Sequence, residues 1–188
     1  MAKRLMGLLV LSFVLTACAK QAIVGSYEGE VDTSSVAMKQ FDETVTYFID
    51  PSLEDLQVTF ECGLLATLSY DWGNTVASAV RETFALRFSD AVESSTPDAD
   101  FLVGYASTHL KSEMQTTLFT VNAKTEVFLV LVVVDGSTGE SDLLTAKINR
   151  NHVIDWSLCS DAPELLDKWT PDLMRVLVRE LSNHVIGQ

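Results

Sequence analysis

The segment FTVNAKTEVFLVLVVV, residues 119–134, is the feature that most constrains the fold. Its odd-numbered positions are apolar almost throughout, which indicates a strand with one face buried along its whole length. Its even-numbered positions are polar in the first half and apolar in the second. The apolar ones are Phe128, Val130, Val132 and Val134. We therefore expect the second face to need cover over its later half, by the N-terminal segment, a helix or a partner.

Two segments have helical rather than strand periodicity. Residues 72–92 place apolar side chains along one stripe, and Asn74 is a suitable N-cap. Residues 169–187 form the clearest amphipathic pattern, with Thr170 as cap and Pro171 in the first helical position. A shorter helix is expected before it, over residues 163–168.

Shorter β patterns surround these helices. The sequence predicts strands over residues 44–50, 56–62 and 101–110, and a hairpin turn at residues 135–140 followed by a return strand through Leu144, Ala146 and Ile148. This order predicts an α+β two-layer sandwich in which two main amphipathic helices cover one face of a mostly antiparallel sheet. Residues 44–188 are expected to form a single domain.

The first seventeen residues have the composition of a secretory signal. Lys3 and Arg4 give a positive start, and the residues from Leu5 to Leu15 are almost all apolar. This stretch is too short to cross a bilayer, which needs about 20 residues. We therefore expect residues 1–17 to be a signal peptide.

The sequence Leu15-Thr16-Ala17-Cys18 resembles the bacterial lipobox. In lipoproteins with this motif the signal is cut before the cysteine, which then carries diacylglycerol and an N-acyl chain such as palmitate. The resemblance implies that Cys18 is the lipidated first residue, and that residues 18–43 are a lipidated N-terminus and tether. Several acyl chains anchor a protein stably, whereas one gives only marginal binding.

Two alternatives to lipidation remain at this point. An ordinary cut after Ala17 would leave Cys18 as a plain thiol, and an uncleaved segment would form a buried helix. If the lipobox is used, Ala19 in place of Asp favours the periplasmic face of the outer membrane under enterobacterial sorting rules.

The mature chain is strongly acidic. Loss of Lys3 and Arg4 from 13 basic residues leaves 11, against 26 Asp and Glu, which is a formal charge of −15. A nucleic-acid partner is disfavoured because such binding needs basic patches. The charge favours solubility, and secondarily the steering of a basic partner.

Lipidation of Cys18 would leave two cysteines in an oxidising compartment. Cys62 and Cys159 could then form a disulfide, which would stabilise the fold by about 2–4 kcal/mol. The alternative is two separate buried thiols. Neither cysteine lies in a CxxC or Cys/His metal pattern.

The sequence offers no recognisable catalytic constellation. His109, His152 and His184 are the only histidines, and they lie in no zinc-binding spacing. Serine-nucleophile motifs and phosphate-binding loops are absent as well. We therefore expect no metal, no cofactor and no enzymatic activity, and rank a hydrolase well below the other functions.

Tyr70 and Trp72 stand just before the first expected helix. They either pack beneath that helix or form an exposed aromatic patch for a partner. Together with Phe128, Val130, Val132 and Val134 they are the candidate partner surface.

The order of elements over residues 44–186, with GNTVASAVRETFALRF, DADFLVGY and the terminal helix, resembles small periplasmic lipoprotein domains. These include auxiliary lipoproteins of ABC-type envelope transporters and the lipopolysaccharide-assembly lipoprotein. The resemblance implies a structural or accessory subunit of an envelope assembly serving transport, secretion, motility or surface polymers, through a protein complex or self-assembly. The alternative is a carrier of lipid or a small apolar ligand. No functional residue is carried over.

Overall fold

The computed structural model describes residues 21–27, 29–31, 33, 41–62, 66–116, 121–154 and 161–186. Their elements are, in chain order, β1 (Gln21–Ser26), β2 (Phe41–Ile49), the 3-10 turn η1 (Pro51–Leu53), β3 (Gln57–Cys62), β4 (Ala66–Asp71), α2 (Gly73–Arg87), β5 (Phe88–Glu93), β6 (Phe101–Thr116), β7 (Val121–Asp135), β8 (Ser141–Ile154) and α3 (Ala162–Ile186). The fold is α+β, as the sequence predicts.

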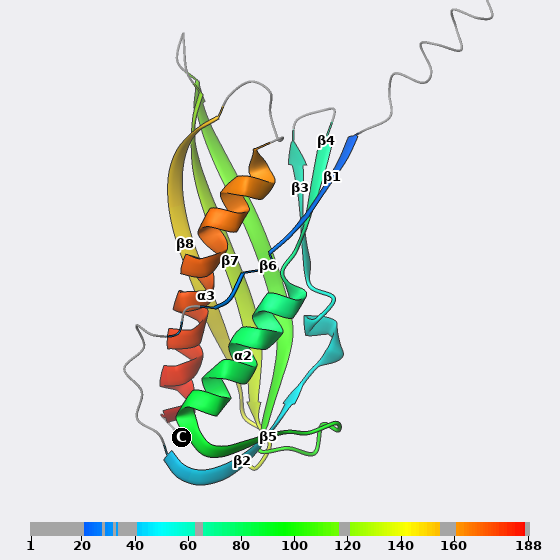
Figure 1. Cartoon of the computed structure of the whole chain (residues 1–188), viewed down its shortest axis with the longest axis vertical. Coiled ribbons are helices and arrows are strands. Elements are labelled where there is room, and N and C mark those ends of the chain that lie inside the picture. Colours follow the sequence, from blue (N-terminus) through cyan, green and yellow to red (C-terminus); the bar gives the residue numbers. More distant parts are fainter. Residues whose placement is uncertain are drawn as a thin grey trace, which may run out of the picture.

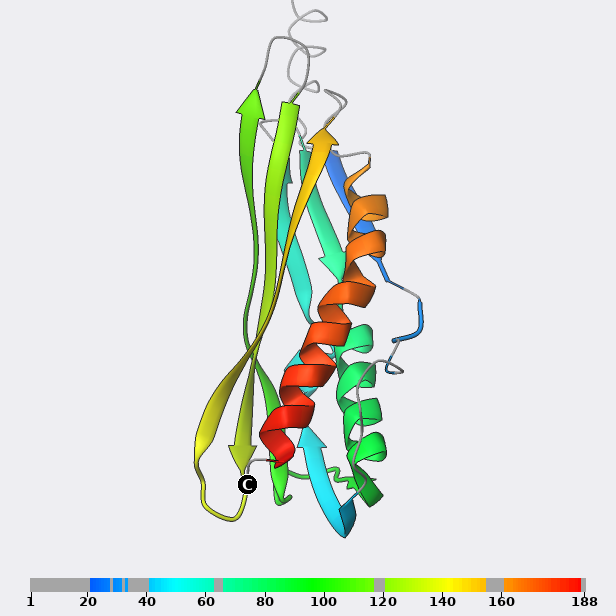
Figure 2. The same cartoon turned by 90° about the vertical axis from the view of Figure 1, so that its left-hand side faces the viewer.

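The strands form two sheets rather than one. A five-stranded sheet has the order β5-β2-β6-β7-β8, and a three-stranded sheet has the order β1-β4-β3. Both sheets are mixed, because β1 pairs with β4, and β2 with β5 and β6, in parallel. The long hairpins β6–β7 and β7–β8 are antiparallel. Figures 1 and 2 show both helices and the smaller sheet on the same side of these long strands.

The core lies between the long strands and the helices. Odd-numbered β7 residues from Ala123 to Val133 are buried, as the alternation predicts. Helix α3 packs on this face with Leu173, Leu177 and Leu181, which are fully buried. At about 25 cal/mol per Å² of apolar surface removed from water, such side chains contribute most of the fold's stability.

Helix α2 is shorter than the predicted helix over residues 72–92. It ends at Arg87, and Phe88 already has extended angles, φ −115° and ψ 145°. Residues 88–93 are instead β5, which pairs with β2, for example Thr46 with Val92. Helical periodicity cannot reveal this pairing, because β2 lies more than forty residues earlier in the sequence.

The start of α2 also differs from the prediction. Asn74 lies inside the helix, and the Asp71 carboxylate accepts the bond from the Gly73 backbone N–H at 2.9 Å. A Cβ at position 73 would lie 1.8 Å from the Glu54 carbonyl oxygen. Glycine is therefore required where α2 passes closest to the turn after η1.

Helix α3 is continuous through Pro171, so the predicted short helix and capped second helix are one element. Thr170 is not an N-cap; its hydroxyl donates to the Leu166 carbonyl at 2.7 Å. The buried stripe of Leu166, Thr170 and Leu173 runs across the proline. Its burial outweighs the hydrogen bond that proline removes.

Part of the predicted tether is folded. Residues 21–26 form β1, and β2 begins at Phe41 instead of residue 44. The burial pattern of β1 alternates, with Ile23 and Gly25 half-buried and Ala22 and Val24 exposed. Pairing with β4 was not visible in the sequence because the pattern is short and partly polar. None of the helices in the described part of the chain is long and apolar enough to cross a membrane.

Candidate docking surface on the outer sheet face

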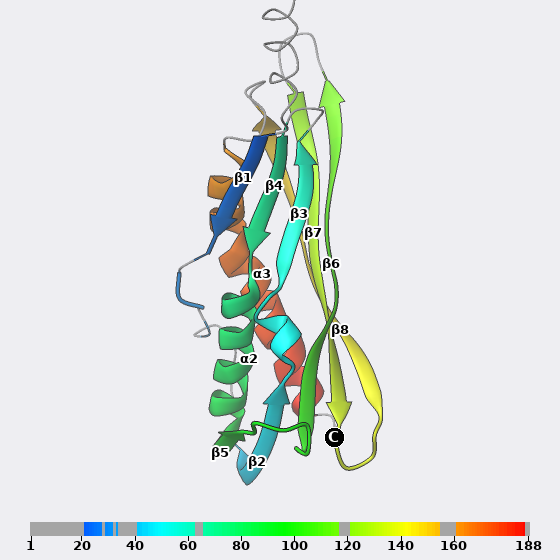
Figure 3. The ribbon, with the colours of Figure 1, turned by 90° about the vertical axis from the view of Figure 1, so that its right-hand side faces the viewer.

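The long strands β6, β7 and β8 have one covered face and one open face. We call the face toward the helices the inner face and the opposite one the outer face. Figures 2 and 3 show that none of the described elements lies over the outer face. The even-numbered β7 residues from Glu126 to Val134 lie there and are half-buried, because neighbouring side chains flank them.

Strand register extends the apolar part of β7 to its neighbours. Val134 pairs with Leu102 of β6, and Val132 pairs with Leu143 of β8. Leu143 is 68% exposed. We define the apolar patch as six outer-face residues: Leu102, Phe128, Val130, Val132, Val134 and Leu143.

The other half of the outer face is polar. It carries Lys111 and Glu113 on β6 and Lys124 on β7, all exposed. Lys147 bonds Glu126 at 2.7 Å across β7 and β8, and this bond holds the pKa of Glu126 below its usual range. The charges on this half are mixed, although the chain as a whole is acidic.

The imidazole of His109 lies where the two halves meet. Its ring centroid is 5.1 Å from that of Phe128, with the rings tilted by 32°. Such a contact covers part of the phenyl ring while the imidazole stays exposed. The apolar patch therefore begins at a defined boundary on β7.

The outer face is large enough for a protein interface. Fifteen β7 residues at about 3.3 Å each, across three strands about 4.8 Å apart, cover roughly 700 Å². A standard interface buries about 800 Å² per partner and has an apolar centre with a polar rim. The outer face has the size and the two kinds of surface that such an interface needs.

Sequence reasoning found four of the six patch residues and missed Leu102 and Leu143. The missed signal at Leu143 was its position beside Leu144: two adjacent leucines in a strand point to opposite faces, so one of them must face outward. Leu102 between Phe101 and Val103 gives the same signal.

Tyr70 and Trp72 do not belong to a partner surface. They are 0% and 1% exposed, so the packing alternative holds and the exposed-patch prediction for these two residues was wrong. Trp72 Nε1 donates to the Thr170 hydroxyl at 2.9 Å, and the Tyr70 hydroxyl bonds the Asp167 carboxylate. Burial and this carboxylate raise the pKa of Tyr70. Both aromatics attach the start of α2 to α3.

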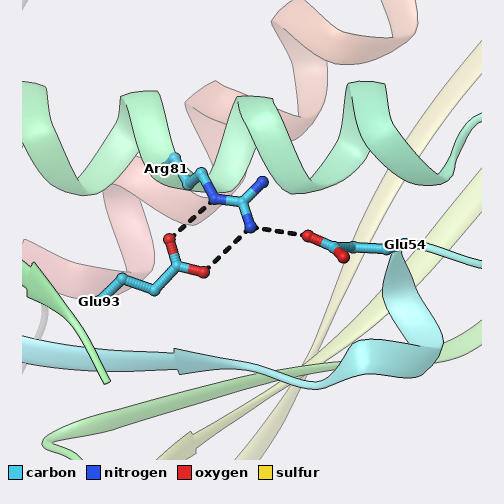
Figure 4. Close-up of polar contacts among 3 residues, drawn as sticks. All are labelled: Glu54, Arg81 and Glu93. Atoms are coloured by element: carbon cyan, nitrogen blue, oxygen red, sulfur yellow. Dashed lines mark hydrogen bonds and ion pairs between the residues drawn. The ribbon is translucent and has the colours of Figure 1, made fainter. Parts of the chain in front are cut away.

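Arg81 links α2 to β5 and to the turn after η1. Figure 4 shows its guanidinium between two carboxylates, with Nε 2.8 Å from Glu93 and Nη2 2.7 Å from Glu54. The Glu93 contact is the main cause of the raised pKa of Arg81. All three side chains are more than one-third exposed, so the cluster orients elements more than it stabilises them.

The histidines lie in separate environments. His152 meets the Trp169 ring edge-on at 5.0 Å, and burial lowers its pKa. His184 Nδ1 lies 3.5 Å from Asp142. Across the described ranges, no group of three or more His, Cys, Asp or Glu residues is arranged to hold a metal ion.

The lipidation and disulfide predictions lie outside what the structure describes. Cys18 precedes the first described residue, and Cys159 falls between residues 154 and 161. Cys62 ends β3, but its side chain is not described. Lipidation of Cys18 and the Cys62–Cys159 disulfide therefore stay predictions.

No protein-family model matches the chain, and no curated protein matches it. Among solved structures, an uncharacterized lipoprotein B from Nitrosomonas europaea is similar at 12% identity and TM-score 0.45, over 84% of this chain and 93% of that one. A minor lipoprotein from Acinetobacter baumannii has 8% identity and TM-score 0.33, over 76% and 90%. A hypothetical protein from Chlamydia trachomatis has 10% identity and TM-score 0.32, over 90% and 97%. At these values the likenesses show neither a family nor a function.

Proposed function

We propose that this chain is an accessory lipoprotein of the bacterial envelope, anchored through Cys18 at the periplasmic face of the outer membrane. Its folded domain docks on a protein subunit of an envelope assembly through the outer face of β6, β7 and β8. The role is structural and involves no catalysis.

The observation that carries the proposal is the contrast between the two faces of one strand. The inner face of β7 is buried by the chain's own elements, and the outer face has an equally apolar half over which no described element lies. Large contiguous apolar patches at the surface mark interaction sites in soluble proteins.

The composition of the outer face favours a protein as the occupant. A purely apolar ligand would use the patch alone, whereas the patch continues into a polar half with both signs of charge. Paired Lys147 and Glu126 border the patch and suit the rim of a protein interface. The mixed charge imposes less repulsion on an acidic partner than the acidic remainder of the chain would.

The test is photo-crosslinking of the intact lipoprotein in the cells that produce it. A photoreactive amino acid replaces Thr145, which lies on the outer face beside Val130, or Asn151, which lies on the same strand and face in the polar half. Both side chains are exposed, so both variants should fold. We expect one adduct of defined mass from position 145 and a weaker or different product from position 151.

The adduct must also depend on the patch. Val132→Thr in the same chain keeps a β-branched side chain and removes apolar surface, so the position-145 adduct should decline. An adduct with the mass of two chains would instead identify a second copy as the occupant, and a lipid adduct would favour the carrier function. Either result would contradict the proposal. Equal amounts of the same adduct from positions 145 and 151 would contradict it as well.

A further inference from the structure

Strand β1 is paired with the rest of the domain along its whole length. All six residues of β1 pair with β4, from Gln21 with Ala66 to Ser26 with Asp71. Gly25 lies against Tyr70, since a Cβ there would come within 2.8 Å of that ring and 3.2 Å of Pro163. A side chain larger than hydrogen would push β1 off the buried Tyr70 and off α3.

The residues after β1 continue this attachment. The Tyr27 carbonyl accepts from the Thr75 hydroxyl at 3.3 Å, and Val31 is buried in the core. Ile23 and Tyr27 are half-buried against the same core. The described chain is therefore part of the folded domain from Gln21 onward.

Only Ala19 and Lys20 separate Cys18 from this first strand residue. Three residue steps span at most about 11 Å even when fully extended. A lipid anchor on Cys18 would thus hold the start of β1 within about that distance of the membrane surface. This is far shorter than the length of the domain along β7, which is about 50 Å.

The start of β1 lies at one end of the elongated molecule. Figures 1 and 2 show β6 and β8 ending, and β7 and α3 beginning, at this same end. The turn between β7 and β8 and the C-terminal end of α3 lie at the opposite end. Val24, the fourth residue of β1, is an apolar side chain that is 79% exposed.

From this geometry we infer that the end of the domain where β1 begins rests on the phospholipid surface that holds the acyl chains. The long axis then points away from the membrane, with the polar half of the outer face near the bilayer and the apolar patch farther out. Leu143 and Asn151 lie eight residues apart on β8, which places them roughly 26 Å apart along the strand. The inference rests on the lipid anchor of the proposed function.

The test uses the full lipoprotein reconstituted in vesicles of phosphatidylethanolamine and phosphatidylglycerol that contain a headgroup-linked energy acceptor. A genetically encoded fluorescent amino acid replaces Asn151 or Leu143, which are both exposed and share one strand and one face. We expect several-fold higher energy transfer from position 151 than from position 143. A third donor at Val24 should match position 151.

A linker variant provides the matched control. Twenty Gly and Ser residues inserted after Lys20 would give the anchor a reach of about 25 Å, so the difference between positions 151 and 143 should be lost. A lipidated protein that floats with vesicles yet transfers energy equally from both positions overturns the orientation alone. A chain whose intact mass shows no lipid and that does not float overturns both the orientation and the anchor of the proposed function.

Discussion

The two faces of β7 show how the same residue types acquire different roles. Leu129 on the inner face is fully buried beneath the helices, whereas Val130 and Val132 on the outer face are only half-buried among their strand neighbours. Within residues 127–134 the sequence does not distinguish the two faces, because odd-numbered and even-numbered positions are both apolar there. What differs is the element that the fold places over each face. The inner face stabilises the domain, and we propose that the outer face binds a partner.

Truncation on each face should separate these roles most strongly. Leu129→Ala should lower the free energy of unfolding by about 2–5 kcal/mol, because it leaves a cavity in the core. Val132→Ala on the outer face should cost less than half as much. Urea unfolding followed by circular dichroism measures both, and equal losses would mean that the outer face is as much a part of the core as the inner one.

The next largest loss of stability is expected at the buried contact between Trp72 and Thr170, among the elements that cover the inner face. Thr170→Val keeps the side-chain shape but leaves the buried Trp72 Nε1 without its acceptor. The expected loss is about 1–3 kcal/mol of unfolding free energy. Thr145→Val, an exposed change on the outer face, is the control and should leave the urea midpoint nearly unchanged. A stable Thr170→Val protein would refute the structural role given to the buried aromatics.

Alkaline pH should destabilise the fold through Tyr70, which bonds Asp167 of α3. The pKa of Tyr70 is raised above its ordinary value of 10, so the unfolded chain ionises at lower pH than the folded one. Stability is therefore fully retained below about pH 10 and declines as pH rises toward the folded-state pKa. Tyr70→Phe should make this decline shallower, although not abolish it, because the pKa of Tyr47 is also raised. Urea midpoints between pH 9 and pH 11.5 test this, and identical slopes would contradict it.

The smallest effect is expected for the exposed Arg81 cluster. Arg81→Met removes both ion pairs and should cost at most about 1 kcal/mol, less at high salt, since the three side chains are more than one-third exposed. The dependence of stability on pH in the acid range should also change, because Arg81 lowers the pKa of Glu93. That stabilisation is present above the unfolded pKa and is lost as pH falls through the lowered one. A loss as large as that of Leu129→Ala would show that α2 depends on this cluster for folding.

Much of the fold was predictable from residue patterns. The alternation of residues 123–134, the stripe of α3 and the hairpin turn at residues 135–140 are local signals, and the structure confirms all three. The inner face and four patch residues followed from period-two alternation alone.

The remaining features depend on contacts between distant segments. Strands β1 and β5 pair with β4 and β2 far away in sequence, and neither has a strong pattern of its own. Pro171 indicated a helix start, yet burial across it makes α3 continuous. Tyr70 and Trp72 were ambiguous because only the position of α3 determines whether they are covered.

The most direct test of the central claim changes the outer face and measures folding and binding together. The triple variant Val130→Thr, Val132→Thr and Leu143→Thr keeps strand-forming residues and removes the centre of the apolar patch. We expect a free energy of unfolding close to that of the native chain, with loss of the defined crosslink from position 145. A variant that unfolds normally and still forms that adduct in full would contradict the proposed docking surface.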